Sequence, residues 1–302
     1  MHARRISAVL LGLTFLLLLV GGVVHSTGSS LACPDWPLCY GQVFPAMRGG
    51  IFYEHSHRLL ASAVGLLTLA LAFAVWSRPA LRRLALLGVA LVVVQGTLGG
   101  LTVLLRLPPA VSIAHLATSM AFFAWATGMR FRLREAAPAP TLPHRAGVLI
   151  AAGAVYVQLV LGAIVRHKGA SLSCGLEALT CLGGWLPTTE LQWLQTAHRV
   201  FALGVTAAVI AGTLEPIKAA RLAGRTLARR LGVAAHALVL AQVLMGVLTL
   251  RTAVHMHVVT THLALGALLW ADLLAFFWAL GPLGGTASTG AAAPAGARPA
   301  AV

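Results

Sequence analysis

The sequence predicts an all-α integral membrane protein whose eight transmembrane helices form two tandem four-helix bundles. Composition, the number of apolar stretches and an internal repeat all point to this fold. Only 10% of the 302 residues are charged and 59% are apolar, with a mean hydropathy of +0.87. A soluble domain carries about 25% charged residues. The composition therefore excludes a water-soluble globule, and its hydrophobicity also excludes a disordered chain.

Eight apolar stretches have the length of a membrane span, which is about 20 residues. They cover residues 6–24, 59–76, 84–105, 111–129, 146–165, 193–214, 231–250 and 258–280. In hydrocarbon each must be helical, because no water is available to unpaired backbone groups. The first stretch is not a cleaved signal peptide, because it is longer than a usual apolar signal core and has a counterpart in mid-chain.

The loops between the stretches differ in positive charge. Fifteen Lys and Arg residues fall on one side of the membrane and seven on the other. Cytoplasmic loops carry the excess of positive charge, so both termini are predicted to be cytoplasmic. The net charge of +15 is then a signal of topology and not of nucleic-acid binding. The N-terminus lacks a transit pattern, which favours a bacterial plasma membrane.

The chain is an internal duplication. At an offset of 141 residues the matched pairs include Gly21 with Gly162, Cys33 with Cys174 and His57 with His198. At an offset of 147 they include Gln95 with Gln242, Gly99 with Gly246 and His115 with His262. Each half has an even number of spans, so a pseudo-two-fold axis along the membrane normal should relate the halves. We expect bundles over residues 1–135 and 136–281 and a disordered cytoplasmic tail over 282–302.

Two long outer loops, residues 25–56 and 166–192, hold all four cysteines. The pairs Cys33/Cys39 and Cys174/Cys181 face the oxidising side, which predicts two disulfides. Reduced pairs are the alternative. Zinc binding is disfavoured, because no histidine stands near these cysteines in a zinc-like spacing.

Four of the twelve histidines obey the repeat, namely His57, His115, His198 and His262. Each is expected near the outer end of an even-numbered span, about one helical turn from the estimated start of its helix. A lone histidine in an apolar helix is more often a structural hydrogen-bonding group. Two imidazoles at equal depth in one bundle, however, suit bis-histidine haem ligation, and a mononuclear metal site would need more ligands.

The residues around these histidines resemble the haem A synthase family. The resemblance rests on GGVVHSTGSSLACPDWPLCYG at 21–41, on EHSHR at 54–58 and on the matched His-Arg pair at 198–199, and it covers all eight spans. One departure is His25, which stands where the family pattern has a basic residue.

The resemblance implies an integral membrane oxidoreductase. Such an enzyme oxidises the C8 methyl group of haem O to a formyl group and so supplies haem A to cytochrome oxidases. It implies that His198 and His262 ligate a tightly held haem b, and that His57 and His115 receive the substrate haem O. A haem O synthase as delivery partner and a separate electron acceptor follow from the family alone.

The two histidine sites differ in one neighbouring residue. Glu54 lies one turn before His57, and its counterpart at an offset of 141 is Gln195. A carboxylate at a membrane boundary is costly. This favours a catalytic Glu54, acting in general acid–base chemistry or stabilising positive charge at the oxidised methyl. A glutamate solvated by the loop is the alternative.

Arg58 and Arg199 follow ligand histidines at the outer surface. Either residue could bind haem propionates through paired N–H donors or extend into the lipid headgroups.

Two further functions stay open: a two-haem membrane cytochrome b in electron transfer, and a transporter. A transporter would place polar sites at the midplane, and histidines at one depth favour lateral over transmembrane electron transfer. The sequence leaves open a homo-oligomer and the roles of Asp272, His255 and His257.

Overall fold

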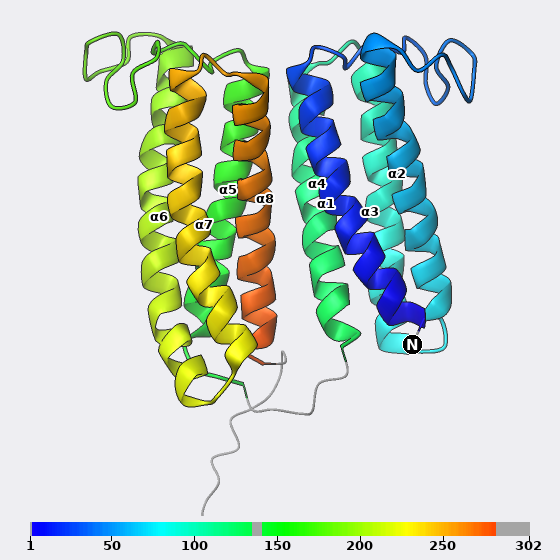
Figure 1. The fold of residues 1–302 in the computed structure, drawn as a ribbon, viewed down its shortest axis with the longest axis vertical. Coiled ribbons are helices and arrows are strands. Elements are labelled where there is room, and N and C mark those ends of the chain that lie inside the picture. The colour runs from blue at the N-terminus through cyan, green and yellow to red at the C-terminus, as the bar shows by residue number, and fades with distance from the viewer. Residues whose placement is uncertain (1, 135–140, 282–302) are drawn as a thin grey trace, which may run out of the picture.

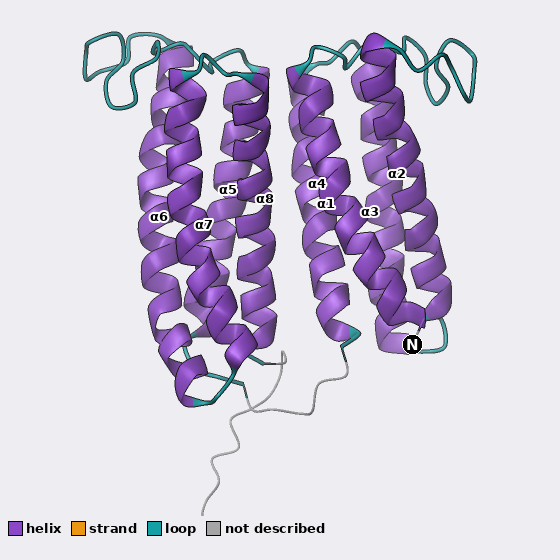
Figure 2. Cartoon of the chain, in the orientation of Figure 1, coloured by secondary structure: helices purple, strands orange, loops and turns teal. Residues whose placement is uncertain are grey.

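The computed structural model describes residues 2–134 and 141–281, and these residues form eight α-helices. The helices are α1 His2–Ser26, α2 Gly49–Ala74, α3 Pro79–Leu104, α4 Pro109–Arg132, α5 Arg145–His167, α6 Glu190–Leu222, α7 Thr226–Arg251 and α8 Met256–Ala279. Each is long and apolar enough to cross a membrane, which confirms the predicted fold class. No strand occurs in the described residues, where helices and loops account for the chain (Figure 2).

The helices begin earlier than the apolar stretches suggest. α2 starts at Gly49 and α6 at Glu190, several residues before each run becomes continuously apolar. At α6 the start is fixed by a capping box, in which the Thr189 side chain accepts the N–H of Gln192 and the Gln192 side chain accepts the N–H of Thr189. Polar residues interrupt both added segments, at 54–58 in α2 and at Glu190 and Gln192 in α6, so hydropathy alone does not detect these helix starts.

Within each half the four helices pack in a ring. In the N-terminal half α1 contacts α2 and α4, and α3 contacts α2 and α4; α5 to α8 repeat this pattern. Figure 1 shows the two groups side by side, with the N-terminus and the end of α8 at one end and the two long loops at the other. The pseudo-two-fold axis along the membrane normal stays a prediction. The predicted boundary at 135/136 and the predicted tail over 282–302 lie outside the described residues.

The halves meet where α8 packs against α1 and α4, and where α5 packs against α4. Two aromatic donors cross this seam to backbone carbonyls of α4. Trp270 donates its indole N–H to Met120 at 3.2 Å, and Tyr156 donates its hydroxyl to Ala117 at 3.1 Å. Buried polar groups of this kind need partners in an apolar interior, so these bonds fix α4 against the C-terminal half.

Both predicted disulfides, Cys33–Cys39 and Cys174–Cys181, are present in the outer loops. Each loop also contains a carboxylate that accepts loop N–H groups. The Asp35 carboxylate accepts from Gly41 at 2.8 Å and from Tyr40 at 2.6 Å, and these bonds, Gly41 first, hold the pKa of Asp35 below its usual value.

The second loop repeats the arrangement with Glu177. Its carboxylate accepts the hydroxyl of Thr180 and the N–H of Gly183, which lower the pKa of Glu177. Both loops are therefore compact turns, each closed by one disulfide and by one carboxylate that is ionised at neutral pH.

Candidate functional site

One cavity of about 890 Å³ is lined by residues from both halves. All four repeat-obeying histidines line it: His57, His115, His198 and His262. Its volume lies in the upper part of the range of about 300–1,000 Å³ that is usual for small-molecule sites. The fold thus brings the four predicted ligands together at one cavity.

The histidines lie deeper in their helices than predicted. His57 and His198 are eight residues past the first residue of α2 and α6, and His115 and His262 are six residues past the first residue of α4 and α8. At 1.5 Å per residue these positions are about 12 Å and about 9 Å from the helix starts. The prediction of one turn is too shallow, because each helix begins before its apolar stretch.

Each histidine ring packs against a glycine of the preceding helix. A Cβ atom built on that glycine would lie 3.1 to 3.4 Å from the imidazole Cε1. The four pairs are Gly21 with His57, Gly99 with His115, Gly162 with His198 and Gly246 with His262. These glycines therefore allow the ring to lie directly on the neighbouring backbone, and this explains why the repeat matches glycines as well as histidines.

Glutamine amides accompany the histidines. Gln95 donates from Nε2 to the His115 carbonyl at 3.0 Å, and Gln158 donates to the His198 carbonyl at 3.0 Å. Sequence reasoning missed Gln158, because its counterpart at an offset of 141 is Leu17 and it breaks the repeat. A search for intramembrane polar residues without a counterpart would have found it. The position that carries the Gln158 amide beside His198 therefore carries Leu17 in the half that contains His57.

Glu54 and Gln195 hold their loops in the same way. The Glu54 carboxylate is buried and accepts the N–H of Cys33 at 2.8 Å, while Gln195 Oε1 accepts the N–H of Cys174 at 2.7 Å. Both residues also line the cavity. The shared contact explains why both positions carry an acceptor. The charge of Glu54 has a partner that Gln195 lacks, the guanidinium of Arg58.

Arg58 and Arg199, two of the arginines that line the cavity, make different contacts. Arg58 donates to Glu54 Oε1 at 2.5 Å, to the carbonyls of Cys33 and Asp35 at 3.2 and 2.7 Å, and to that of Leu38. Its guanidinium is therefore occupied in holding the first loop. Arg199 donates to the Thr180 carbonyl at 2.9 Å, and its buried Nε and Nη2 have no partner within the described part of the chain.

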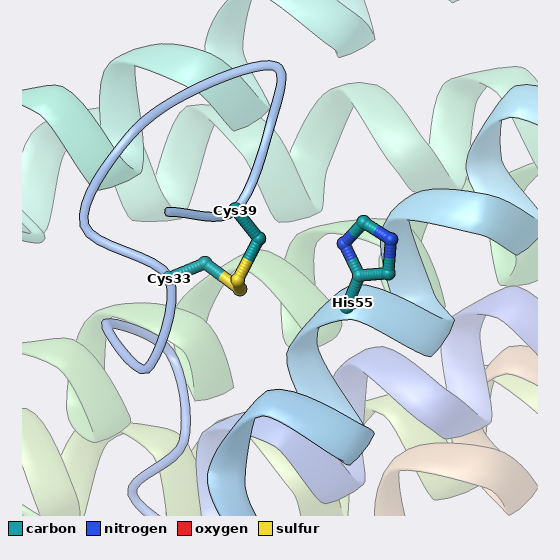
Figure 3. A group of neighbouring side chains, drawn as sticks. All are labelled: Cys33, Cys39 and His55. Atoms are coloured by element: carbon teal, nitrogen blue, oxygen red, sulfur yellow. A yellow bond between two sulfur atoms is a disulfide. The ribbon is translucent and has the colours of Figure 1, made fainter. Parts of the chain in front are cut away.

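The first loop also covers the cavity. Trp36 lines the cavity and packs flat on Gly100 of α3, where an added Cβ would lie 2.9 Å from a ring atom. Figure 3 shows His55 beside the disulfide of the same loop. The Cys33 and Cys39 sulfurs and a ring nitrogen of His55 lie within 4.8 Å of one another. The sequence spacing does not reveal this neighbour, but the disulfide keeps both sulfurs from acting as thiolate ligands.

Three residues with open roles lie outside the cavity lining. His255 and His257 are exposed at the start of α8, with ring centroids 5.4 Å apart. Asp272 lies deep in α8 and is half-buried, and its Oδ2 has no hydrogen-bond partner within residues 2–134 and 141–281. The structure assigns none of these three residues to the histidine site.

The polar groups that line the cavity are of the kinds that bind two porphyrins. Each half presents two imidazoles on facing helices, and Nδ1 of His57, His198 and His262 is buried without a partner in the described residues. The glycines opposite each ring leave the histidines room beside a flat ligand. The free N–H groups of Arg199 add a carboxylate receptor at the cavity wall.

Comparison with known proteins identifies the family. The sequence profile of the cytochrome oxidase assembly proteins named COX15-CtaA matches residues 4–51 and 46–274, which is most of the chain. The chain belongs to this family.

Three similar proteins carry the name heme A synthase. The protein of Bacillus licheniformis is 32% identical over 220 residues, which cover 67% of this chain and 72% of the relative. The protein of Bacillus pumilus is 31% identical over 220 residues, which cover 67% and 71%. The protein of Shouchella clausii is 34% identical over 203 residues, which cover 62% and 67%.

Proposed function

We propose that the protein is a haem A synthase, an oxidoreductase that converts the C8 methyl group of haem O to a formyl group. One observation carries the proposal: a single cavity is lined by two matched pairs of histidines, each packed on a glycine. Membership of the cytochrome oxidase assembly family and relatives named heme A synthase support the same function.

In this proposal the C-terminal half holds haem b through His198 and His262. A bound haem b supplies one-electron redox chemistry. Gln158 fixes the backbone at His198, and Gly162 and Gly246 set the ring positions. The unpaired N–H groups of Arg199 bind a propionate, and this role suits Arg199 better than Arg58, whose donors hold the first loop.

The N-terminal half receives haem O between His57 and His115. Glu54 lies one turn before His57 and lines the same cavity, so its carboxylate is placed to exchange a proton with the substrate or to stabilise developing positive charge. Trp36 covers this part of the cavity and limits the access of water. The loop end of the molecule faces outward, and both termini face the cytoplasm.

The direct test is pigment extraction from membranes of cells that make the chain and are supplied with haem O. We expect haem A, and we expect His57→Ala or His115→Ala to abolish it. His255→Ala is the matched control, because this exposed histidine does not line the cavity. If two haem b groups were recovered with no haem A, the protein would be an electron-transfer cytochrome instead.

A further inference from the structure

Three basic side chains gather at the outer end of the seam between the halves. They are His25 at the end of α1, and Arg166 and His167 at the end of α5. The ring centroids of His25 and His167 are 4.8 Å apart, and all three side chains are half-buried and line the cavity. We call these three residues the seam cluster.

The helical register places the seam cluster beside both histidine pairs. His25 follows Gly21 by four residues and Arg166 follows Gly162 by four, so each lies on the same helix face as its glycine, about 6 Å further outward. Gly21 contacts His57 and Gly162 contacts His198. His25 therefore lies near His57, Arg166 lies near His198, and His167 lies beside His25.

The seam cluster has no counter-charge within the described residues. The ion pairs found there join Arg58 to Glu54, Lys168 to Glu190 and Lys218 to Glu215. The loop carboxylates Asp35 and Glu177 accept N–H groups of their own turns. Arg166 is the permanent cation of the cluster, and a half-buried guanidinium without a partner is costly, so the cluster is suited to an anion that enters the cavity.

We propose that His25, Arg166 and His167 form an oxyanion-binding subsite that takes a propionate carboxylate of a porphyrin in the cavity. The inference rests on the proposed function. The planar guanidinium of Arg166 offers paired N–H donors to a carboxylate. Arg199, on α6, donates to Thr180 in the second loop, whereas the seam cluster stands at the ends of α1 and α5. Since the subsite lies near both histidine pairs, one anion there couples the occupancy of the two halves.

The test compares two ligands that differ only in charge. Iron protoporphyrin IX and its dimethyl ester are titrated into the full chain in detergent, after the porphyrin content of the purified protein is measured. Arg166→Gln should weaken binding of the free acid at least tenfold, on the scale of one charge-assisted hydrogen bond, and leave the ester unchanged. Lys168→Gln is the control, because Lys168 is exposed, pairs with Glu190 and does not line the cavity.

A second variant and a second ligand keep the outcomes separate. His167→Gln should act in the same direction if Arg166→Gln fails to fold. Equal preference for acid over ester in wild type and both variants would overturn the proposal. A lipid phosphate has the same chemistry, so the variants are also compared in nanodiscs of phosphatidylglycerol and of phosphatidylcholine. A loss confined to phosphatidylglycerol would assign the subsite to lipid. Haem A formation by the wild-type chain tests the proposed function independently.

Discussion

Glu54 is the residue at which the duplicated sites differ in charge. Glu54 and Gln195 make one equivalent contact, because each accepts the N–H of the first cysteine in its own loop. The distance is 2.8 Å from Cys33 to Glu54 and 2.7 Å from Cys174 to Gln195. Glu54 adds an ion pair with Arg58 at 2.5 Å. Gln195 instead donates to the Ser171 carbonyl. Because an amide already performs the loop contact in the second half, Glu54→Gln removes the charge and keeps the acceptor.

We therefore expect Glu54→Gln to fold, to keep both disulfides and haem b, and to lose haem A formation by about a hundredfold or more, the scale of a general acid–base group. Haem extraction and chromatography from membranes measure the product. Glu54→Ala serves as comparison, since it removes the loop contact as well. Haem A at near-normal levels in Glu54→Gln would mean that Glu54 only holds its loop and that catalysis resides elsewhere.

At the scale of helices, the glycine opposite each histidine is the element that places the ring. A Cβ on Gly162 would lie 3.1 Å from His198 Cε1, whereas a Cβ on Gly153 of the same helix would meet nothing within 4 Å. Gly162→Ala should displace the ring and lower the haem b content several-fold. Gly153→Ala should leave it unchanged and favour the helix by up to about 1 kcal/mol.

The reduced spectrum and the haem-to-protein ratio of the two variants measure this difference. Thermal unfolding shows whether either variant merely destabilises α5. If Gly162→Ala retained a wild-type spectrum and haem content, the contact with His198 would be incidental, and the matched glycines of the repeat would need another explanation.

The sequence predicted the helices, and singled out the four histidines that line the cavity, for a physical reason. Hydrocarbon permits only helices, so apolar length is enough to count them, and duplication marks His57, His115, His198 and His262 as the histidines that recur. The starts of α2 and α6 escaped prediction, because the polar residues 54–58 interrupt the apolar run near the start of α2 and a capping box fixes the start of α6. The sequence also did not predict the hydrogen bonds from Arg58 to loop carbonyls, because residue spacing does not determine how a loop folds.

Residues that break the repeat were the hardest to interpret. Gln158 stands opposite Leu17, and the seam residues Arg166 and His167 stand opposite His25 and Ser26. A search for repeats discards such positions, although they are where the two halves became different. Their roles depend on contacts between halves, and only the packing of α1, α4, α5 and α8 supplies those contacts.

At the scale of the whole molecule, the seam determines whether the halves act as one enzyme. Gly22 of α1 lets α8 approach, because an added Cβ would lie 3.1 Å from Leu263 Cδ2 and 3.3 Å from Thr260 Cγ2. One turn further out, the hydroxyls of Ser26 and Thr260 are 3.3 Å apart. A larger side chain at Gly22 therefore acts as a wedge beside the seam cluster, away from the contacts inside either bundle.

Gly22→Leu should open the outer seam and reduce haem A formation several-fold while haem b stays bound, because His198 and His262 lie within the ring of α5 to α8. Gly12→Leu is the matched control, since Gly12 lies in the same helix and has nothing within 4 Å of an added Cβ. The haem A to haem O ratio and the haem b content per protein are measured for both. If Gly22→Leu retained the wild-type ratio of haem A to haem O and the wild-type haem b content, the halves would work independently. The shared cavity would then be a by-product of packing. A loss of haem b together with haem A would instead show that the C-terminal bundle needs its neighbour to hold its own cofactor.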